Sequence, residues 1–279
     1  MQNQTSITGK SLTQLGTVNI FGVPLLAASE IDCAKLIMAE INSGHGGWCV
    51  TVNLDILRQI TTNPDVKKLI ENSNLFTADG ISLVLASWLR GTPLPERVCG
   101  CNLIYSLTEQ AAQSGRSVFL LGGNPDTAQK AAEILKQRYP GLIVAGTYYP
   151  PFGFEQDSQQ IEAMVQLIRS AQPDIVYVAL GFPKQEKLIK QIRHACPNAW
   201  WIGIGISFSY VCGEFQRAPL WVQRLALETF YRVTLEPRRL AKRYLVIGPP
   251  FAARLLISSL LERFSIGKAH SIPCSRLVD

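Results

Sequence analysis

Polar residues and glycines follow five separate apolar runs of this 279-residue chain, at the points where strands are expected to end. Open parallel sheets bind their ligands in the crevice at the carboxyl ends of the strands. Glycines there let a ligand approach the backbone, and the amides that open the helix after Asn124 can face a phosphate. Five such strand ends at one edge of a sheet favour a nucleotide-type ligand. The positions are Thr51 and Asn53; Thr77, Asp79 and Gly80; Gly122, Gly123 and Asn124; Gly181, Pro183, Lys184, Gln185 and Glu186; and Gly203, Gly205 and Ser207.

Each of these residues also has a purely structural interpretation. Gly122-Gly123 can form a tight turn, Asp79 can cap a helix, and Asn53 and Gln185 can be ordinary turn or first-turn residues. The Gly203-Ile-Gly205 segment begins like a dinucleotide fingerprint, but Phe208 stands where the third glycine belongs, which argues against a Rossmann cofactor site. For single residues the structural interpretation is preferred. Their joint placement at one edge is what favours a binding site.

The elements that must position these residues alternate along the first 215 residues. Short apolar runs alternate with amphipathic stretches, a pattern that predicts a three-layer, Rossmann-like α/β domain on a largely parallel sheet. Asn124 before Pro125, like Asn63 before Pro64, predicts a capped helix start. The expected strands are 48–52, 75–76, 117–121, 142–145, 174–180 and 200–204, and the expected helices are 30–43, 54–60, 64–73, 80–89, 103–114, 125–138, 158–171 and 184–195.

The positive charge of the chain is concentrated near its end. The formal net charge is +6, from 27 Lys+Arg and 21 Asp+Glu. Between Arg217 and Lys268 the sequence has 10 basic and 3 acidic residues, or +7, which leaves −1 for the rest. We therefore predict an α/β domain over residues 1–215 and a basic helical appendage over 216–279. Its expected helices are 219–235, 237–247 and, after a break at Gly248-Pro249-Pro250, 251–264.

Targeting and cysteine signals favour the cytoplasm. The first 16 residues are polar and lack a signal-peptide core. The most apolar stretch, 244–261, is interrupted by Gly248-Pro249-Pro250 and Arg254, so no membrane-spanning helix is expected. Seven cysteines without a Cys-X-X-Cys pair, beside three histidines, predict reduced thiols and no metal site.

Six motifs, in order and spacing, resemble those of the WecG/TagA/CpsF glycosyltransferases, also called glycosyltransferase family 26. The resemblance runs from Asn19 to Tyr244. The motifs are Thr51-Val-Asn53, Thr77-Ala-Asp79-Gly80, Arg97-Val-Cys-Gly100, Leu120-Leu-Gly-Gly123, Gly181-Phe-Pro-Lys-Gln-Glu186, and Arg217-Ala-Pro-Leu-Trp221 followed by Glu236-Pro-Arg-Arg-Leu240 and Arg243-Tyr244.

The resemblance implies a GT-E fold and an inverting hexosyltransferase. Such an enzyme moves a sugar, here expected to be N-acetylmannosamine or a related hexose, from a UDP-sugar to a polyprenyl-diphosphate-linked acceptor in cell-surface polysaccharide synthesis. The resemblance also implies that Asp79 is the general base and that Arg97 lies near phosphate or acceptor. It implies a donor pocket that includes Thr51, Asn53 and Gln185. We add Gly122, Gly123 and Glu186 to the candidate binding residues. The sequence contains no Asp-X-Asp motif, in agreement with the metal independence that the resemblance implies, and no cofactor is expected besides the donor substrate.

The basic appendage fits the same resemblance. The resemblance implies that the appendage docks on the inner face of the cell membrane and supplies arginines to the active site. We match these arginines to Arg232, Arg239 and Arg243. A helix over 238–247 would carry these bases beside an apolar stripe, which suits an anionic membrane surface better than nucleic acid. A basic helix pair that only contacts solvent is the alternative. Oligomeric state, as monomer or homo-oligomer, stays open.

Two positions depart from the family pattern. Asn102 and Ser209 stand where the family usually has aspartates. Their loss is compatible with another donor or acceptor sugar, or with weakened catalysis. The second hypothesis is therefore a catalytically silent, membrane-recruited homologue that binds UDP-sugars as a scaffold.

Overall fold

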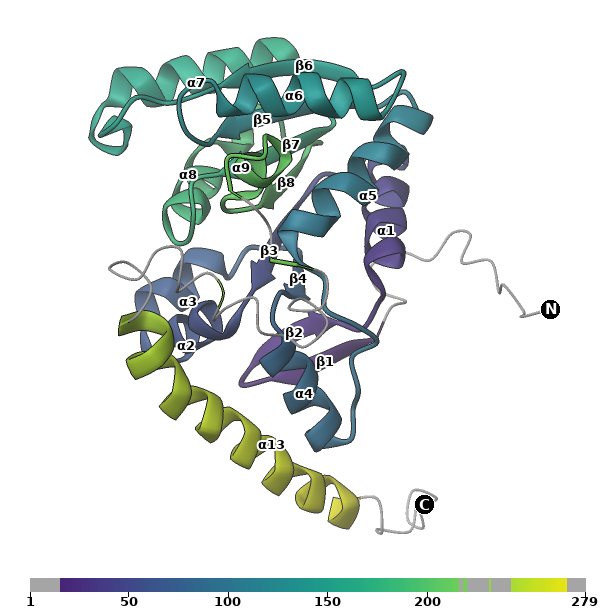
Figure 1. Ribbon diagram of the computed structural model, residues 1–279, viewed down its shortest axis with the longest axis vertical. Helices are drawn as coiled ribbons and strands as arrows, with labels where there is room; N and C mark the ends of the chain where they lie inside the picture. The colour runs from purple at the N-terminus through teal and green to yellow at the C-terminus, as the bar shows by residue number, and fades with distance from the viewer. Residues whose placement is uncertain (1–15, 216–217, 220–230, 232–241, 270–279) are drawn as a thin grey trace, which may run out of the picture.

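A computed structural model describes residues 16–215, 218, 219, 231 and 242–269 (Figure 1). Within these residues the chain forms an α/β/α sandwich around one eight-stranded sheet, as predicted. The sheet order is β1-β2-β4-β3-β8-β7-β5-β6. Every neighbouring pair is parallel except β1 and β2. The strands are β1 (Thr17–Ile20), β2 (Val23–Leu26), β3 (Gly47–Val52), β4 (Leu75–Ala78), β5 (Ser117–Gly122), β6 (Ile143–Tyr148), β7 (Ile175–Ala179) and β8 (Trp200–Gly203).

Helices cover both faces of the sheet. Helices α1 (Glu30–Asn42), α5 (Gly100–Gln113), α6 (Thr127–Arg138) and α9 (Ser207–Val211) bury their apolar residues in one core cluster. The opposite cluster receives α2 (Leu54–Thr62), α3 (Pro64–Ile70), α4 (Ile81–Arg90), α7 (Ser158–Ala171), α8 (Lys184–Ile192) and α13 (Gly248–Ala269). The described residues also include three shorter helical segments: the 3-10 helices η2 (Phe154–Gln156) and η3 (Arg193–Ala195), and the π-helix η4 (Lys242–Ile247).

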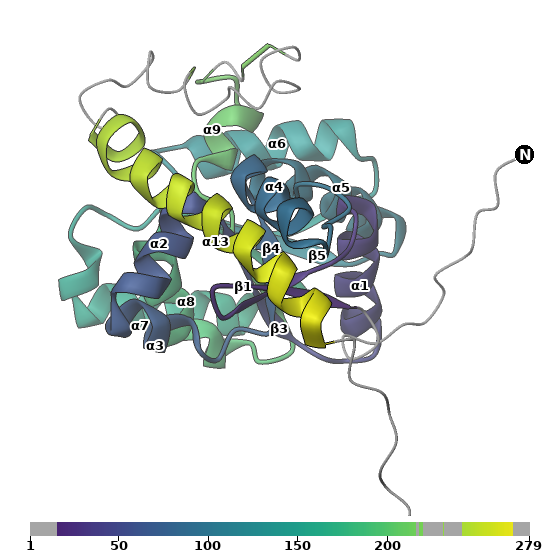
Figure 2. The ribbon, with the colours of Figure 1, turned by 90° about the horizontal axis from the view of Figure 1, so that it is seen from below.

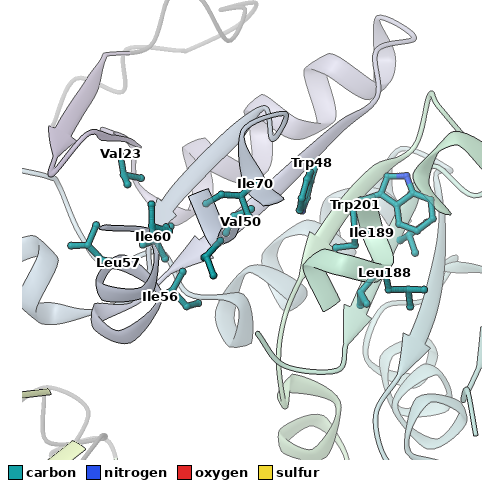
Figure 3. Packing of buried hydrophobic residues seen from close by; sticks show 14 of the residues in the cluster. Val23, Trp48, Val50, Ile56, Leu57, Ile60, Ile70, Leu188, Ile189 and Trp201 are labelled. Atoms are coloured by element: carbon teal, nitrogen blue, oxygen red, sulfur yellow. The ribbon is translucent and has the colours of Figure 1, made fainter. Parts of the chain in front are cut away.

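The central strands are apolar throughout because helices cover both of their faces. All six residues of β3 are buried. Successive side chains of a strand point to opposite faces, so Trp48 and Val50 join the core on the α2 side while Cys49 joins the other. Figure 3 shows this packing, with Trp48 between the α2–α3 residues and Trp201.

A hairpin at the edge of the sheet was not predicted. Strands β1 and β2 pair antiparallel through a turn at Phe21 and Gly22, whose φ angles are 50° and 83°. The Gly22 amide donates a 2.9 Å hydrogen bond to Asn19 Oδ1. Positive φ at both central residues is the turn geometry that suits a tight hairpin.

The predicted break at Gly248-Pro249-Pro250 is wrong. Helix α13 begins at Gly248, directly after η4, so the chain is helical from 242 to 269. Proline is tolerated in the first turn of a helix because its missing N–H would have no partner there. Residues Leu245–Phe264 also meet the length and composition of a membrane-crossing helix, with a mean hydropathy of 1.4.

Helix α13 packs on the α/β core. Phe251 and Leu255 belong to the core cluster of the α2 side. The Phe251 ring meets the ring of Phe21 edge to face at 6.0 Å, and the guanidinium of Arg254 lies 5.8 Å from the same Phe21 ring. Figure 2 shows α13 crossing this face of the molecule beside α4. The predicted boundary at 215/216 lies at the edge of the described residues and stays a prediction, as do the helix predicted for 219–235 and the part of the predicted helix 237–247 that precedes residue 242.

Candidate functional site at the carboxyl edge of the sheet

Five adjacent parallel strands carry the predicted site residues. Strands β4, β3, β8, β7 and β5 are neighbours in that order, so their carboxyl ends form one continuous edge. Asp79 follows β4, Asn53 follows β3, and Gly205 follows β8. Gln185 lies in the first turn of α8, the helix that follows β7, and Gly123 follows β5. The predicted convergence of these strand ends is therefore present in the fold.

Asn53 and Asp79 lie next to each other. Asn53 caps α2, because its Oδ1 accepts hydrogen bonds from the amides of Asp55 (3.1 Å) and Ile56 (3.0 Å). The Asp79 amide donates a 2.8 Å hydrogen bond to the Val52 carbonyl, which fixes it to the end of β3. The cap uses only the oxygen of the Asn53 carboxamide, so its Nδ2 protons take no part in it. The half-buried Asp79 is not the cap of α4, because Gly80 occupies that position.

The segment that carries Arg97 is hydrogen-bonded to the end of β4, next to Asp79. The Val98 amide donates a 2.9 Å hydrogen bond to the carbonyl of Ala78, the residue before Asp79. Helix α5 then starts at Gly100, where an added Cβ would come within 3.0 Å of the Ile204 Cα. Arg97 and Asp79 are both half-buried. Asp79, Asn53 and the Arg97 segment thus form one group at the ends of β3 and β4.

Thr51 and Gly203 connect this group to β8. Thr51 is 7% exposed, and its hydroxyl donates a 3.1 Å hydrogen bond to the Gly203 carbonyl. The hydroxyl therefore joins two neighbouring strands in this structure. Its contact with a sugar, implied by the resemblance, stays a prediction.

Gln185 and Glu186 form a buried network behind the edge. Gln185 Oε1 accepts hydrogen bonds from the amides of Gly181 and Gly205, both at 3.1 Å, and its Nε2 donates to Glu186 Oε1 at 2.9 Å. A Cβ on Gly203 would overlap Gln185 Nε2 and lie 2.9 Å from Glu186 Oε1. Gln185 therefore holds the loops after β7 and β8 together, and glycine at 203 leaves room for it.

Glu186 is a buried carboxylic acid. It is 1% exposed, and its Oε2 is buried without a hydrogen-bond partner among the described residues. Burial raises the pKa of Glu186 from its usual 4.5 to about 8, against a smaller opposing effect of the hydrogen bond from Gln185. The carboxyl group is therefore mostly protonated at neutral pH. A direct contact of Glu186 with substrate stays a prediction.

Gly122 and Gly123 shape the turn into α6. Gly122 has a φ of 101°, and a Cβ there would lie 2.7 Å from the Ala179 carbonyl oxygen. The Gly123 amide donates to that same carbonyl at 2.7 Å. Gly122 thus lets β5 and β7 approach closely at the edge. Their contact with a phosphate stays a prediction.

The predicted Asn124 cap is wrong. Asp126, with a φ of 61°, precedes α6 and makes no side-chain cap. Asn124 Nδ2 instead donates to Glu214 Oε2 at 3.2 Å, and Thr127 Oγ1 donates to Glu214 Oε1 at 2.8 Å. The sequence offered no motif that pointed to Glu214, whose partners Asn124 and Thr127 lie 90 and 87 residues earlier in the chain.

The groups around Glu214 stabilise the charged form of its carboxyl group. Slight burial raises its pKa, but hydrogen bonds from Thr127, Ser209 and Asn124, with the charge of Lys130, outweigh it and lower the pKa below its usual value. Ser209, one of the two departures from the family pattern, therefore contacts a carboxylate. An aspartate at 209 would bring a second negative charge to the same place.

Three predicted residues cannot be placed at the site. Arg232 and Arg239 lie outside the described residues, and of Arg243 only the backbone, in η4, is described. Across residues 16–215 and 242–269, no group of three or more His, Cys, Asp or Glu side chains is arranged to hold a metal ion.

The chain is similar to known glycosyltransferases. The Glycosyl transferase WecG/TagA/CpsF family matches residues 18–265. A Bacillus subtilis protein is 36% identical over 216 residues, which are 77% of this chain and 81% of the relative. A Bacillus spizizenii protein is 33% identical over 199 residues, or 71% and 75%. Both relatives are named N-acetylglucosaminyldiphosphoundecaprenol N-acetyl-beta-D-mannosaminyltransferase. With nearly the whole described fold inside that match, the chain belongs to the WecG/TagA/CpsF family of glycosyltransferases.

Proposed function

We propose that this glycosyltransferase moves N-acetylmannosamine from a UDP-linked donor to N-acetylglucosamine carried on a polyprenyl diphosphate, with inversion at the anomeric carbon. The observation that carries the proposal is the Bacillus subtilis relative, of which this chain covers 81% and whose name states both the transferred sugar and the acceptor. The position of Asp79 beside Asn53 at the carboxyl edge supports it.

Asp79 is the proposed general base. Its carboxylate takes the proton of the acceptor hydroxyl while that oxygen forms a bond to the anomeric carbon. The bond from this carbon to the diphosphate oxygen breaks on the opposite face, and UDP leaves with the electron pair. A carboxylate with a pKa of about 4 is a weak base, so substrate binding has to shield the half-buried Asp79 from water.

Arg97 and backbone amides are proposed to stabilise the departing diphosphate. Preorganised donors aimed at the developing charge are a strong contribution to such a step. The backbone next to Arg97 is joined to the residue before Asp79 by the Val98–Ala78 hydrogen bond, which supports this role. The proposed reaction needs no metal, a proposal supported by the lack of an Asp-X-Asp motif. Arg232, Arg239 and Arg243 stay proposed contributors from the appendage, and the proposed location is the inner membrane face.

A donor panel tests the proposal. The full chain is incubated with UDP-N-acetylmannosamine, UDP-N-acetylglucosamine or UDP-glucose, each with and without a prenyl-diphosphate-linked N-acetylglucosamine, and UDP release is measured. We expect acceptor-dependent release with the mannosamine donor. UDP binding by calorimetry without transfer from any donor would instead support the silent scaffold, the alternative that Asn102 and Ser209 suggest.

A further inference from the structure

Cys99 and Cys101 bring two sulfur atoms together at the start of helix α5. Their Sγ atoms lie 3.1 Å apart, and one thiol donates to the other. Two residues of chain keep their Cα atoms at most about 7 Å apart, and a disulfide needs about 4.4–6.8 Å. The two sulfurs would have to move only about 1 Å closer to reach the length of a disulfide bond. The reduced pair is therefore close to the geometry of a disulfide.

The two thiols differ in their access to solvent. Cys99 is 0% exposed, whereas Cys101 is half-buried. A reagent that arrives from solvent therefore meets Cys101 first, and Cys99 lies within reach of the Cys101 sulfur. An accessible cysteine beside a second cysteine that can displace whatever binds to it is the usual arrangement of redox-responsive pairs.

The other described cysteines lie in different surroundings. Burial raises the pKa of the Cys33 thiol and raises that of Cys49 to about 12, which keeps both as unreactive thiols. The thiols of Cys196 and Cys212 each donate to a backbone carbonyl. Among the described cysteines, the pair at α5 thus combines an accessible thiol with a thiol partner.

A disulfide suits this pair better than a metal ion does. Within the described residues, no third His, Cys, Asp or Glu joins Cys99 and Cys101 in a group that could hold a metal. The residue between them is Gly100, where an added Cβ would lie only 3.0 Å from the Ile204 Cα. Glycine is also the residue with the greatest backbone freedom, so the short Cys-Gly-Cys segment can adjust to a closed ring.

The pair belongs to the segment that connects the candidate site to α5. The Val98 amide donates to the Ala78 carbonyl at 2.9 Å, and the Cys99 carbonyl accepts from two amides that open α5, at 3.1 and 2.9 Å. A bridge across a single residue departs from relaxed disulfide geometry and so strains the backbone around it. Its closure would therefore disturb the start of α5 and the backbone that follows Arg97.

We propose that Cys99 and Cys101 form a reversible disulfide by exchange with small-molecule disulfides, and that closure of this bridge slows the reaction at the site beside Arg97. The thiolate of Cys101 attacks one sulfur of the small disulfide, which leaves as a thiol, and a mixed disulfide remains on Cys101. The sulfur of Cys99 then attacks the Cys101 sulfur and displaces the second small thiol.

The exchange balances without a further reactant. Two cysteine thiols are oxidised, one small disulfide is reduced to two thiols, and the two cysteine protons end on those thiols. Thiols should reopen the bridge, because strained disulfides are the readily reduced ones. The effect on activity rests on the proposed function, whereas the disulfide itself does not.

Peptide masses test the disulfide. The reduced full chain is incubated with oxidised glutathione, its remaining thiols are alkylated in denaturant, and the protein is digested with trypsin. Both cysteines fall in one peptide, 98–116, which has no other cysteine. We expect this peptide to escape alkylation and to lose the mass of two hydrogens, and dithiothreitol should reverse the change. A wild-type peptide that keeps two alkylated thiols, or that keeps glutathione, would overturn the proposal.

Single substitutions separate the two steps of the exchange. Cys99→Ser removes the second step, so glutathione should stay on Cys101. Cys101→Ser leaves only the buried thiol, and its peptide should stay unmodified. Cys212→Ser, at another half-buried cysteine, is the control and should close the bridge like the wild type. Circular dichroism checks that each variant is folded. Equal glutathione on the wild-type and Cys99→Ser peptides would contradict the pairing.

Transfer assays test the effect on activity. The oxidised wild type and oxidised Cys212→Ser should transfer sugar about 10-fold more slowly than their reduced forms, since a shift of about 1 Å can cost up to about 10²-fold. Cys101→Ser should transfer equally with and without oxidised glutathione. If no form transfers sugar, the proposed function fails while the peptide masses still decide the disulfide. Equal rates for bridged and reduced wild type would contradict the effect on activity.

Discussion

The side-chain amide of Gln185 donates a 2.9 Å hydrogen bond to the buried carboxyl group of Glu186, while the oxygen of the same amide accepts from Gly181 and Gly205. One side chain therefore fixes the loops after two neighbouring strands. Glu186 holds the amide in the orientation that makes both backbone contacts possible. Because burial keeps the pKa of Glu186 near 8, the pair stays uncharged at neutral pH.

Glu186→Gln should remove a pH dependence of stability. The native pKa of about 8 lies above the usual 4.5, so the native state holds a proton that the unfolded chain releases. The stability that this proton gives is complete below 4.5 and is lost as pH rises to about 8, with a slope of at most about 1.4 kcal/mol per pH unit. Urea unfolding between pH 5 and 9 should show a flatter profile for Glu186→Gln.

The exposed Glu162 on α7 provides the control for that measurement. Glu162→Gln removes the same charge from the surface and should leave the wild-type profile nearly unchanged. Parallel profiles for wild type and Glu186→Gln would show that Glu186 is not a buried, protonated acid.

Gly203→Ala should destabilise the chain by about 1–3 kcal/mol, because the added Cβ overlaps a well-packed pair. The overlap is with Gln185 Nε2, and Glu186 Oε1 lies 2.9 Å away. Gly80→Ala is the matched control, since its nearest neighbour would be Leu83 Cδ1 at an ordinary 3.5 Å. Both are compared by denaturant unfolding. Equal losses for the two variants would contradict the packing described for Gly203.

Glu214→Gln should tighten the binding of UDP about three- to tenfold. The Glu214 carboxylate contacts Asn124 and Thr127 at the start of α6, the place where the sequence predicts a phosphate. Removing its charge lowers the repulsion that a diphosphate would meet there. Calorimetry at fixed ionic strength measures the change, with Glu133→Gln, farther along the same helix, as control. If both variants bind UDP like the wild type, the diphosphate does not bind at α6.

Local patterns predicted the layers well. Runs such as Ile175–Ala179 are apolar throughout because both faces of the strand are covered, and that signal lies within the run itself. Asn63 caps α3 with Pro64 in its first turn, as the sequence predicted, because cap and helix are adjacent in the chain.

Contacts between distant residues were less predictable. Asn124 resembles Asn63 in sequence, but its amide contacts Glu214 instead of a helix start. The Thr51–Gly203 hydrogen bond spans 152 residues, so only the fold brings its partners together. The prolines at 249 and 250 also suggested a break, although the first turn of a helix accepts them. The location of the site at this edge of the sheet was thus predictable from the sequence, whereas the hydrogen bonds within it were not.

Asp79→Asn should lower turnover by about 10²–10⁴-fold, the usual contribution of a general base. The amide keeps the shape of the side chain but cannot accept the acceptor proton. The affinity for UDP should change little, since the substitution leaves the backbone contact to Val52 in place. Transfer assays and UDP calorimetry on the same preparation separate the two quantities. Turnover equal to that of the wild type would exclude Asp79 as the base.

The most direct measurement is mass spectrometry of the lipid product. Full-length protein is mixed with UDP-N-acetylmannosamine and a prenyl-diphosphate-linked N-acetylglucosamine, and the lipid is analysed before and after incubation. We predict that the wild type adds the mass of one N-acetylhexosamine to the lipid and that Asp79→Asn adds almost none in the same time. A lipid of unchanged mass, although the protein binds UDP, would contradict the proposed transfer reaction.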